Sequence, residues 1–331
     1  MEKKLTFEEI KSCFLGAETL YEENGCVKCC RFTPEEQGVY RSNPDFFNKS
    51  CSSSNMIISF FTDAEKVVLE YEADTASSRR YAYVDVKVDG IIVAHSGAED
   101  VKENPANTIE LPLSGKKCKV EFFLPPLASF SCKALTLVNG GLLEPARREK
   151  FFICYGDSIT QGYDARFPLC AYTSHLAENF KAEVINKAIG GEFFIPALVS
   201  AGKKGRKVDL VTVAYGTNDW SRCAADVFAE NCENFFAALA ELYPETPVAV
   251  ILPLWRKDHD RETLAGNFFE HREKIRTIAG KYPQNRFIDG LELTPHVEEF
   301  YSDAYLHPND LGFMFMGQKV TEEIKKLFPA L

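Results

Sequence analysis

From about residue 150 onward, the chain alternates short apolar runs with stretches of helical periodicity. The runs are long enough for buried strands: KFFICY, EVINKA, VDLVTVAYG, PVAVILPL and RFIDG. Between and after them, apolar residues recur at helical spacing in two groups: Val227, Phe228, Cys232, Phe235, Leu239 and Leu242, then Phe313, Met316, Val320, Ile324 and Leu327. This alternation predicts βαβ units with right-handed crossovers, and therefore an α/β domain with a parallel sheet covered by helices on both faces.

The first half of the chain has a different period. Residues from about 17 to 143 contain many short strand-like runs separated by turn signals, and helical periodicity is scarce there. One run places Asp89 and Gly90 where a tight hairpin turn is expected. Many short strands at this spacing predict a β-sandwich of the jelly-roll type. With 331 residues there is room for two domains, which we place at 1–145 for the sandwich and 146–331 for the α/β domain.

Candidate functional residues follow the apolar runs of the second half. The run KFFICY stops abruptly before Ser158, and VDLVTVAYG is followed by Asn218. The run EVINKA leads into a glycine pair ending at Gly191, whose backbone N–H no side chain shields. Near the C-terminus lies His307, with Asp303 close by in the sequence. Because ligands of open α/β sheets bind outside the carboxyl ends of the strands, we expect these residues at one edge.

These residue types together point to acyl transfer. A serine hydroxyl is a poor nucleophile until a neighbouring base takes its proton, and His307 is the natural base for Ser158. The tetrahedral intermediate needs hydrogen-bond donors for its oxyanion, which the backbone N–H of Ser158, the backbone N–H of Gly191 and the side chain of Asn218 would supply. Each short motif alone is common in turns, so the prediction rests on their coincidence in this order.

Four segments together resemble the four sequence blocks of the SGNH (GDSL-type) hydrolases: GDSIT, the N-x-A-x-x-G run from Asn186 to Gly191, GTND and the late His-Pro. The resemblance covers residues 151 to 328. It implies a three-layer, flavodoxin-like domain in which Ser158 is the nucleophile and His307 the base, with Gly191 and Asn218 as oxyanion donors. A sandwich leading directly into such a domain is similar to the two-domain carbohydrate acetyl esterases.

One departure concerns the catalytic acid. The SGNH family usually carries D-x-x-H, but the position three residues before His307 is Ala304, and Asp303 lies one residue further back. Either the loop bulges so that Asp303 still reaches the imidazole, or a backbone carbonyl orients His307 and the site is a Ser-His dyad.

The sequence thus predicts a serine esterase that removes a short acyl group, most simply acetyl, from a carbohydrate or related polyol, without a cofactor. Tyr163, Trp220 and Trp255 are predicted to contact substrate, because flat rings with a polar handle suit a sugar-like alcohol. One alternative is a lipase or thioesterase for longer acyl chains. Another is a non-catalytic glycan-binding protein with a decayed hydrolase domain, which only the departure at Ala304 favours.

The charge and composition of the sequence indicate which classes of partner to expect. A net charge of −10 argues against nucleic acid, whose binding requires Lys and Arg to neutralise phosphates. The charged start MEKKLTFEEIK does not resemble a signal peptide, and no run is apolar and long enough to span a membrane. We therefore expect a cytoplasmic protein. In that reducing compartment its eleven cysteines are expected to be free thiols. The cluster from Cys26 to Cys30 lacks a second ligand pair, so no metal is predicted. The expected partner is a small-molecule or oligosaccharide acyl ester, and a homo-oligomer is left open.

Overall fold

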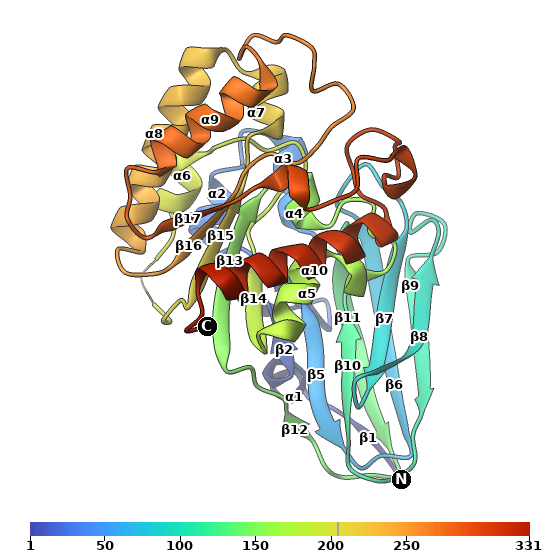
Figure 1. Ribbon diagram of the computed structural model, residues 1–331. Coiled ribbons are helices and arrows are strands. Elements are labelled where there is room, and N and C mark those ends of the chain that lie inside the picture. Colours follow the sequence, from blue (N-terminus) through green and yellow to red (C-terminus); the bar gives the residue numbers. More distant parts are fainter. Residues whose placement is uncertain (204) are drawn as a thin grey trace.

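The strands of the computed structural model, which describes residues 1–203 and 205–331, form two antiparallel sheets and one parallel sheet. The antiparallel sheets come from the chain before residue 146 and the parallel sheet from the chain after it. In Figure 1 the antiparallel strands occupy the lower right, and the parallel sheet with its helices occupies the upper left. The two kinds of architecture predicted for the two halves are confirmed.

The antiparallel sheets pack face to face as a β-sandwich around a shared apolar core. One sheet has the order β3-β4-β11-β6-β9 with β1 beside β11, and the other has the order β12-β5-β10-β7-β8 with β2 beside β5. The strands are β1 Glu2–Lys4, β2 Phe14–Leu15, β3 Thr19–Glu23, β4 Cys26–Cys30, β5 Ile57–Thr62, β6 Lys66–Thr75, β7 Ala82–Val88, β8 Ile91–Ala98, β9 Ala106–Pro112, β10 Cys118–Phe123, β11 Ala128–Val138 and β12 Glu144–Pro145. Short helices α1 Phe7–Ser12, α2 Pro34–Gly38 and α3 Pro44–Ser50 interrupt them.

The predicted hairpin joins β7 to β8 through Asp89 and Gly90, both of which have positive φ angles, 48° and 84°. Two such residues in succession form the turn whose twist matches that of paired strands. Along β7, Val84 and Val86 point into the sandwich core and are fully buried. Val84 and Val86, which are two residues apart along the strand, therefore mark the face of this sheet that packs on the core.

The parallel sheet has the order β14-β13-β15-β16-β17, which is the 2-1-3-4-5 order of flavodoxin-like folds. Its strands are β13 Lys150–Gly156, β14 Ala182–Asn186, β15 Leu210–Ala214, β16 Val248–Ile251 and β17 Asn285–Ile288. The helices of this half are α4 Ser158–Gln161, α5 Tyr172–Asn179, α6 Pro196–Ser200, α7 Thr217–Arg222, α8 Ala225–Leu242, α9 Phe268–Ala279 and α10 Asp310–Leu327, with 3-10 turns at Pro168–Cys170, Gly290–Glu292 and Glu298–Phe300.

Helices cover both faces of this sheet because its central strands are apolar on both sides. In β13, Ile153 and Tyr155 pack in the same core cluster as α6, α8 and α9, whereas Phe152 and Cys154 pack with α5 and α10. A strand buried on both faces reads as a continuous apolar run, which is why KFFICY shows no alternation. The result is the predicted three-layer arrangement (Figure 1).

The change from one architecture to the other occurs over a few residues. The last strand of the sandwich, β12, pairs with β5 and ends at Pro145, and β13 begins at Lys150. Residues 146–149 therefore connect the last strand of the sandwich to the first strand of the parallel sheet.

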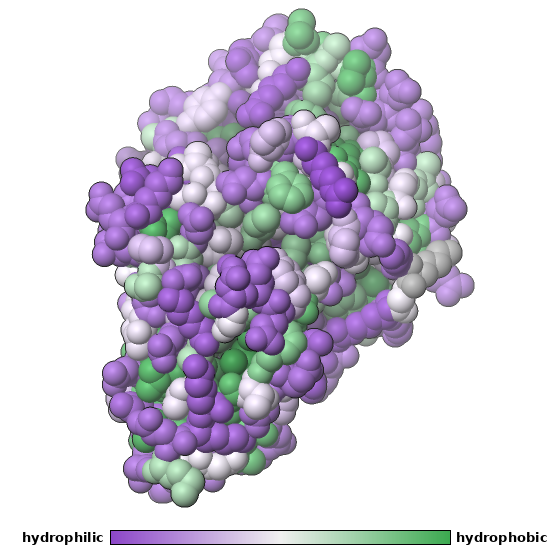
Figure 2. Space-filling view, turned by 180° about the vertical axis from the view of Figure 1, so that it is seen from behind, coloured by the Kyte–Doolittle hydropathy of each residue, from purple (hydrophilic) through white to green (hydrophobic). Residues whose placement is uncertain are grey.

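The surface is largely polar on the side turned away from the view of Figure 1. Hydrophilic residues cover most of that face, and hydrophobic residues form small, separated patches (Figure 2). Among the helices of residues 1–203 and 205–331, none combines the length and the apolar character needed to cross a bilayer.

Candidate active site

Ser158 lies where the first strand of the parallel sheet turns into a short helix. Strand β13 ends at Gly156, and Asp157 then caps α4 by accepting a hydrogen bond from the backbone N–H of Ile159 at 3.0 Å. Asp157 of the GDSIT segment therefore has a structural role, because this bond holds the turn between β13 and α4. Burial raises the pKa of Asp157 to about 6. The turn leaves Ser158 5% exposed at the carboxyl edge of the sheet.

His307 and Asp303 reach this serine from the loop before α10. The Nε2 atom of His307 lies 2.9 Å from the Oγ atom of Ser158, and its Nδ1 atom lies 2.7 Å from the Oδ2 atom of Asp303. The three side chains therefore form one continuous hydrogen-bonded line, although 149 residues separate the serine from the histidine.

A bulged turn provides the extra residue between Asp303 and His307. Ala304 has a φ angle of 54°, in the left-handed region that side chains other than glycine seldom adopt. The other carboxylate oxygen of Asp303 accepts backbone N–H bonds from Tyr305, Leu306 and His307, at 2.9, 2.7 and 3.1 Å. Of the two arrangements considered from the sequence, the loop thus has the one in which Asp303 reaches the imidazole.

The electrostatics of this turn favour a charged carboxylate. Burial alone would raise the pKa of Asp303, but the hydrogen bonds from the ring and the backbone of His307 and from the backbone of Leu306 outweigh it. They hold the pKa of Asp303 well below its ordinary range, so the carboxylate facing His307 is ionised at neutral pH.

Asn218 lies at the start of α7, against the loop that carries Gly191. Its side-chain Nδ2 donates to the backbone carbonyl of Glu192 at 2.9 Å, which leaves the second N–H of the amide for another acceptor. Gly191 has a φ angle of 87°, a conformation suited to glycine. The preceding residue, Gly190, donates its N–H to Oε1 of Gln161 at 2.7 Å, and Gln161 is the last residue of α4. The loop is thereby joined to both helices of the site.

Helix α7 begins so abruptly after β15 because of Gly216. Its φ angle is 116°, and a Cβ atom there would lie 2.6 Å from the side chain of Ile275 and 2.8 Å from that of Pro253. Only glycine meets both the conformational and the steric requirement. The glycine of the GTND motif therefore fixes the direction from which Asn218 enters the site.

The three aromatic residues predicted to contact substrate have different surroundings. The ring of Tyr163 lies 4.9 Å, between centroids, from the imidazole of His307, and its hydroxyl is hydrogen-bonded to Ser78. Trp255 is partly buried and stacks on His296 with centroids 5.4 Å apart. Trp220 is fully buried, and its Nε1 donates to the carbonyl of Gly266 at 2.9 Å. The prediction that Trp220 contacts substrate needs correction, because its indole is fully buried, with the guanidinium groups of Arg256 and Arg261 over the ring, and leaves no face open to a sugar.

Other residues next to the site carry no short motif that sequence reasoning could use. Arg79, in the connection between β6 and β7 of the sandwich, binds the buried carboxylate of Asp164 through two hydrogen bonds of 2.6 and 2.9 Å. Asp164 also accepts from Ser302, which lies beside Asp303. A connection in the first domain thus supports the loop that holds His307. Such contacts depend on the tertiary packing of segments about 140 residues apart in the sequence.

Glu192 is a second residue that the sequence did not single out. Its carboxyl is fully buried and accepts hydrogen bonds from the hydroxyls of Tyr40 and Tyr215, at 2.5 and 2.7 Å. Burial, which the two tyrosine bonds only partly offset, raises the pKa of Glu192 to about 8. The neutral carboxylic acid therefore predominates in the folded protein at pH 7.

We expect Glu192→Gln to change how stability depends on pH. Between the ordinary carboxyl pKa of 4.5 and about 8, the folded protein retains a proton that the unfolded chain releases, so rising pH favours unfolding. Glutamine has no such proton. The melting temperature of the variant, relative to the wild type, should rise by several degrees between pH 5 and pH 8 in calorimetry. An equal difference at both pH values would show that Glu192 does not titrate as described.

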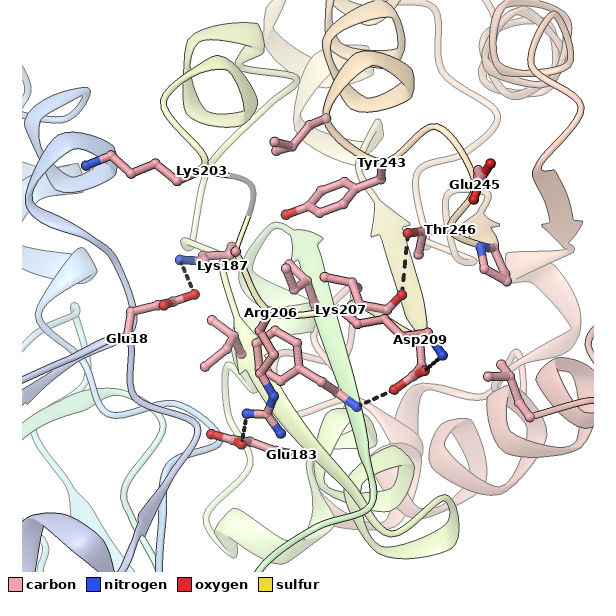
Figure 3. A pocket seen from close by; sticks show the side chains of 18 of the residues that line it. Glu18, Glu183, Lys187, Lys203, Arg206, Lys207, Asp209, Tyr243, Glu245 and Thr246 are labelled. Atoms are coloured by element: carbon pink, nitrogen blue, oxygen red, sulfur yellow. Dashed lines mark hydrogen bonds and ion pairs between the residues drawn. The ribbon is translucent and has the colours of Figure 1, made fainter.

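One cavity lies away from these residues, at the amino ends of the parallel strands. Its volume is about 850 Å³, and residues at the start of β13, β14, β15 and β16 line it. Several charged side chains around it are paired with one another, namely Lys187 with Glu18, Arg206 with Glu183 and Lys207 with Asp209 (Figure 3). Ligands of this kind of sheet bind at the opposite edge, where Ser158 lies, so we assign the chemistry to that edge.

In the part of the chain that the structure describes, no group of three or more His, Cys, Asp or Glu side chains is placed to hold a metal ion. The cysteines from Cys26 to Cys30 lie in β4, whose side chains alternate between the two faces of the sheet.

Comparisons with known proteins bear on the fold and on the class of chemistry. Residues 154–314 match the model of the GDSL-like lipase/acylhydrolase family. A sequence comparison with curated proteins gave no match. Among solved structures, a salicylyl-acyltransferase from a tetracycline biosynthetic pathway is similar with a TM-score of 0.83 and 21% identity, over 95% of this chain and 94% of that one.

Two carbohydrate-active enzymes are similar over almost their whole length. A family two carbohydrate esterase from Cellvibrio japonicus has a TM-score of 0.67 and 15% identity, and an acetyl xylan esterase from the rumen bacterium Butyrivibrio proteoclasticus has 0.63 and 11%. In each case 99% of this chain and 98% of the other chain are covered. Sequence identities this low show only that the fold is shared. The match to the family model indicates the class of chemistry. Residues 154–314 are therefore similar to the GDSL-like lipase/acylhydrolase family, and this similarity supports an ester-hydrolysing enzyme.

Proposed function

We propose that this chain is a serine esterase that hydrolyses short-chain acyl esters, acetyl esters above all, of a carbohydrate or polyol. The observation that carries the proposal is the hydrogen-bonded line from Ser158 through His307 to Asp303 at the carboxyl edge of the sheet. A serine hydroxyl within hydrogen-bond reach of an imidazole, whose other nitrogen faces an ionised carboxylate, is the arrangement that activates serine for nucleophilic attack.

In the proposed acylation step, the Oγ atom of Ser158 attacks the ester carbonyl carbon while Nε2 of His307 takes its proton. Asp303 keeps the hydrogen of the ring on Nδ1, so that Nε2 is the basic nitrogen, and it stabilises the imidazolium that forms. The resulting oxyanion accepts hydrogen bonds from the backbone N–H groups of Ser158 and Gly191 and from the side chain of Asn218. The intermediate then releases the alcohol, which takes the proton from His307.

In the proposed deacylation step, water replaces the alcohol. His307 takes a proton from the water as its oxygen attacks the acyl carbon, the same donors stabilise the second oxyanion, and the acid leaves as Ser158 regains its proton. All groups that move protons or hold charge are side chains or backbone groups of this chain. The mechanism therefore requires no cofactor.

The proposed alcohol rests on the similar structures and on two aromatic side chains. Two of the similar structures bear the names of a carbohydrate esterase and an acetyl xylan esterase, and they share both domains of this chain. Trp255 keeps part of its surface exposed, and the buried ring of Tyr163 lies 4.9 Å from the imidazole of His307, so these two residues are the proposed substrate contacts. An aromatic face with a polar edge nearby suits the ring of a sugar.

An ester panel tests this substrate assignment. We expect acetylated sugars to be hydrolysed with a higher kcat/KM than simple alkyl acetates, because binding energy from the sugar positions the ester. Activity should fall as the acyl chain grows beyond about four carbons, since a small acyl site accepts added methylenes only with strain. Trp255→Leu should reduce the advantage of the sugar esters and leave alkyl acetates nearly unchanged.

The alternatives predict a different pattern in the same panel. A lipase or thioesterase would prefer octanoyl or longer esters and gain nothing from a sugar alcohol. A glycan-binding protein with a decayed hydrolase domain would hydrolyse none of the esters. Either result would overturn the proposed substrate, and the second would overturn the proposed activity as well.

A cytoplasmic location forms part of the proposal. All eleven cysteines are free thiols in the structure, a usage that supports a reducing compartment. Fractionation of cells that produce the protein, with an antibody against it, would test this directly.

A further inference from the structure

A polar segment of the first domain lies directly behind the loops that carry the proposed oxyanion donors. After α3, residues Ser52, Ser53, Ser54 and Asn55 are all buried. Ser53 donates to backbone carbonyls within the sandwich, whereas Ser54 donates to the carbonyl of Gln161 at 2.6 Å. This segment therefore joins the sandwich to α4, beside which α3 lies in Figure 1.

Arg31, the residue that follows β4, is the centre of this contact. Its side chain is fully buried, and all five of its N–H groups have oxygen partners. Two of the partners are the carbonyls of Asn186 and Ala188, the latter at 2.8 Å, in the loop that leads to Gly191. The others are the carbonyl of Lys49, at 3.1 Å, and the carbonyl and hydroxyl of Ser52, both at 2.9 Å.

The partners of Arg31 are neutral oxygens, so its charge is compensated only by dipoles. Burial lowers the pKa of Arg31 to about 10, which still leaves the guanidinium charged at neutral pH. A buried charge is tolerated only with full hydrogen bonding, and a planar guanidinium fixes the directions of the carbonyls that supply it. The loop from Asn186 to Ala188 is thus held to the first domain in one geometry.

Ser52 extends the network from Arg31 to the serine helix. Its hydroxyl accepts from Arg31 and from Nε2 of Gln161, at 2.9 and 3.0 Å. Gln161 in turn accepts from the N–H of Gly190 at 2.7 Å, and Nζ of Lys49 donates to the carbonyl of Gly190 at 2.9 Å. The helix that begins at Ser158 and the loop that carries Gly191 are therefore tied together through side chains of the first domain.

We propose that Arg31 and Ser52 are positioning residues for the oxyanion hole, so that the sandwich domain is required for catalysis and not only for stability. This inference rests on the proposed function, because it assumes that the N–H groups of Ser158 and Gly191 bind the oxyanion. Donors must be held within about 0.5 Å of their working positions. The network from Arg31 to Gly190 fixes the two donor segments relative to each other.

The test uses Ser52→Ala and Arg31→Lys in the full-length protein. Ser52→Ala removes the hydroxyl between Arg31 and Gln161, and Arg31→Lys keeps the charge but removes the planar set of donors. We expect kcat/KM for an aryl acetate to fall about 10- to 100-fold, the effect of a displacement of roughly 1 Å in a catalytic site. Rates are expressed per active serine, counted by end-point labelling with a fluorophosphonate, so that misfolded protein does not contribute.

Inhibitor binding distinguishes positioning from stability. A trifluoromethyl ketone is attacked by Ser158, whose proton passes to His307, and its carbonyl oxygen becomes an oxyanion. Its affinity should fall by about the same factor as kcat/KM in both variants. The matched methyl ketone, which is not attacked, should bind as it does to the wild type.

Two control variants alter similar contacts away from the loop. Arg148 also joins the domains, binding Glu121 of β10 at 3.0 Å and Glu178 of α5 at 2.6 Å. Ser59 is a fully buried serine of β5 that donates to Glu121 at 3.1 Å. Arg148→Lys and Ser59→Ala should lower the melting temperature while kcat/KM per active serine stays within about twofold of the wild type.

The inference fails if Ser52→Ala and Arg31→Lys keep wild-type kcat/KM and wild-type affinity for the trifluoromethyl ketone. If Arg31→Lys does not fold, Ser52→Ala decides the result. If the proposed function itself were wrong, Ser158→Ala would retain its activity. This outcome differs from failure of the positioning role, in which Ser158→Ala is inactive. An inactive Ser158→Ala together with a fully active Ser52→Ala would contradict the positioning role alone.

Discussion

Replacing Ser158 with alanine is expected to reduce kcat for an aryl acetate by about 10⁴- to 10⁶-fold, the range seen when a serine nucleophile is removed. The variant lacks the oxygen that forms the acyl-enzyme, and what remains is the weak catalysis provided by the oxyanion donors and substrate binding. The fold should be unchanged, because the substitution removes only one oxygen atom from this buried side chain and so leaves very little empty space.

A buried serine in the same domain provides the control for this substitution. Ser174 in α5 is hydrogen-bonded to the carbonyl of Pro168 at 2.8 Å and to Oδ1 of Asn55 at 3.3 Å, and neither partner is a proposed catalytic residue. Ser174→Ala should keep near-normal turnover, with a loss of stability of about 1 kcal/mol, the usual value of one hydrogen bond. Near-normal turnover in Ser158→Ala, measured on protein with an unchanged circular dichroism spectrum, would refute the nucleophile assignment.

Asp303→Asn is expected to lower kcat by up to about 10⁴-fold. The amide has no charge to stabilise the imidazolium, and its NH₂ group can donate to Nδ1 of His307, which moves the hydrogen of the ring to Nε2. In that tautomer Nε2 no longer accepts a proton from Ser158, 2.9 Å away. Steady-state kinetics with an aryl acetate, supported by circular dichroism, would measure the loss.

The neighbouring Ala304 gives a matched control for the turn. Because its φ angle is 54°, Ala304→Gly should be tolerated, with activity close to wild type and stability equal or slightly higher. A loss below about tenfold in Asp303→Asn would show that the carboxylate is not needed to orient His307. The site would then work as a Ser-His dyad despite the 2.7 Å contact.

The order of the secondary structure was predictable because the apolar pattern follows directly from burial. The unbroken run of β13 and the helical spacing of α10 both correspond to side chains that are buried in the structure. The burial of single positions was harder to predict. Val227 belongs to the helical pattern in the sequence but is 49% exposed, since it lies in the first turn of α8 and points away from the sheet. Helical periodicity predicts which face of a helix is buried. It does not predict whether a residue at the edge of that face is buried or exposed.

The candidate site was predictable where each residue follows a strand. Ser158 and Asn218 lie at the carboxyl ends of β13 and β15, so sheet topology alone brings them to one edge. The contact of Asp303 with His307 depends on a positive φ angle at Ala304, which an alanine in the sequence does not suggest. The burial of Trp220 depends on the loop around Gly266, and the bonds of Arg31 depend on how two domains meet. Such long-range packing leaves no local pattern in the sequence.

The most direct test of the account is to find which residue reacts with a fluorophosphonate. We expect one label per chain, located on Ser158 by peptide mass spectrometry, because only a serine activated by a neighbouring base reacts quickly. Labelling should be lost in Ser158→Ala and should slow strongly when His307 is replaced by alanine. A label on any other residue, or no labelling of a correctly folded protein, would contradict the assignment of Ser158 and His307 as the reacting pair.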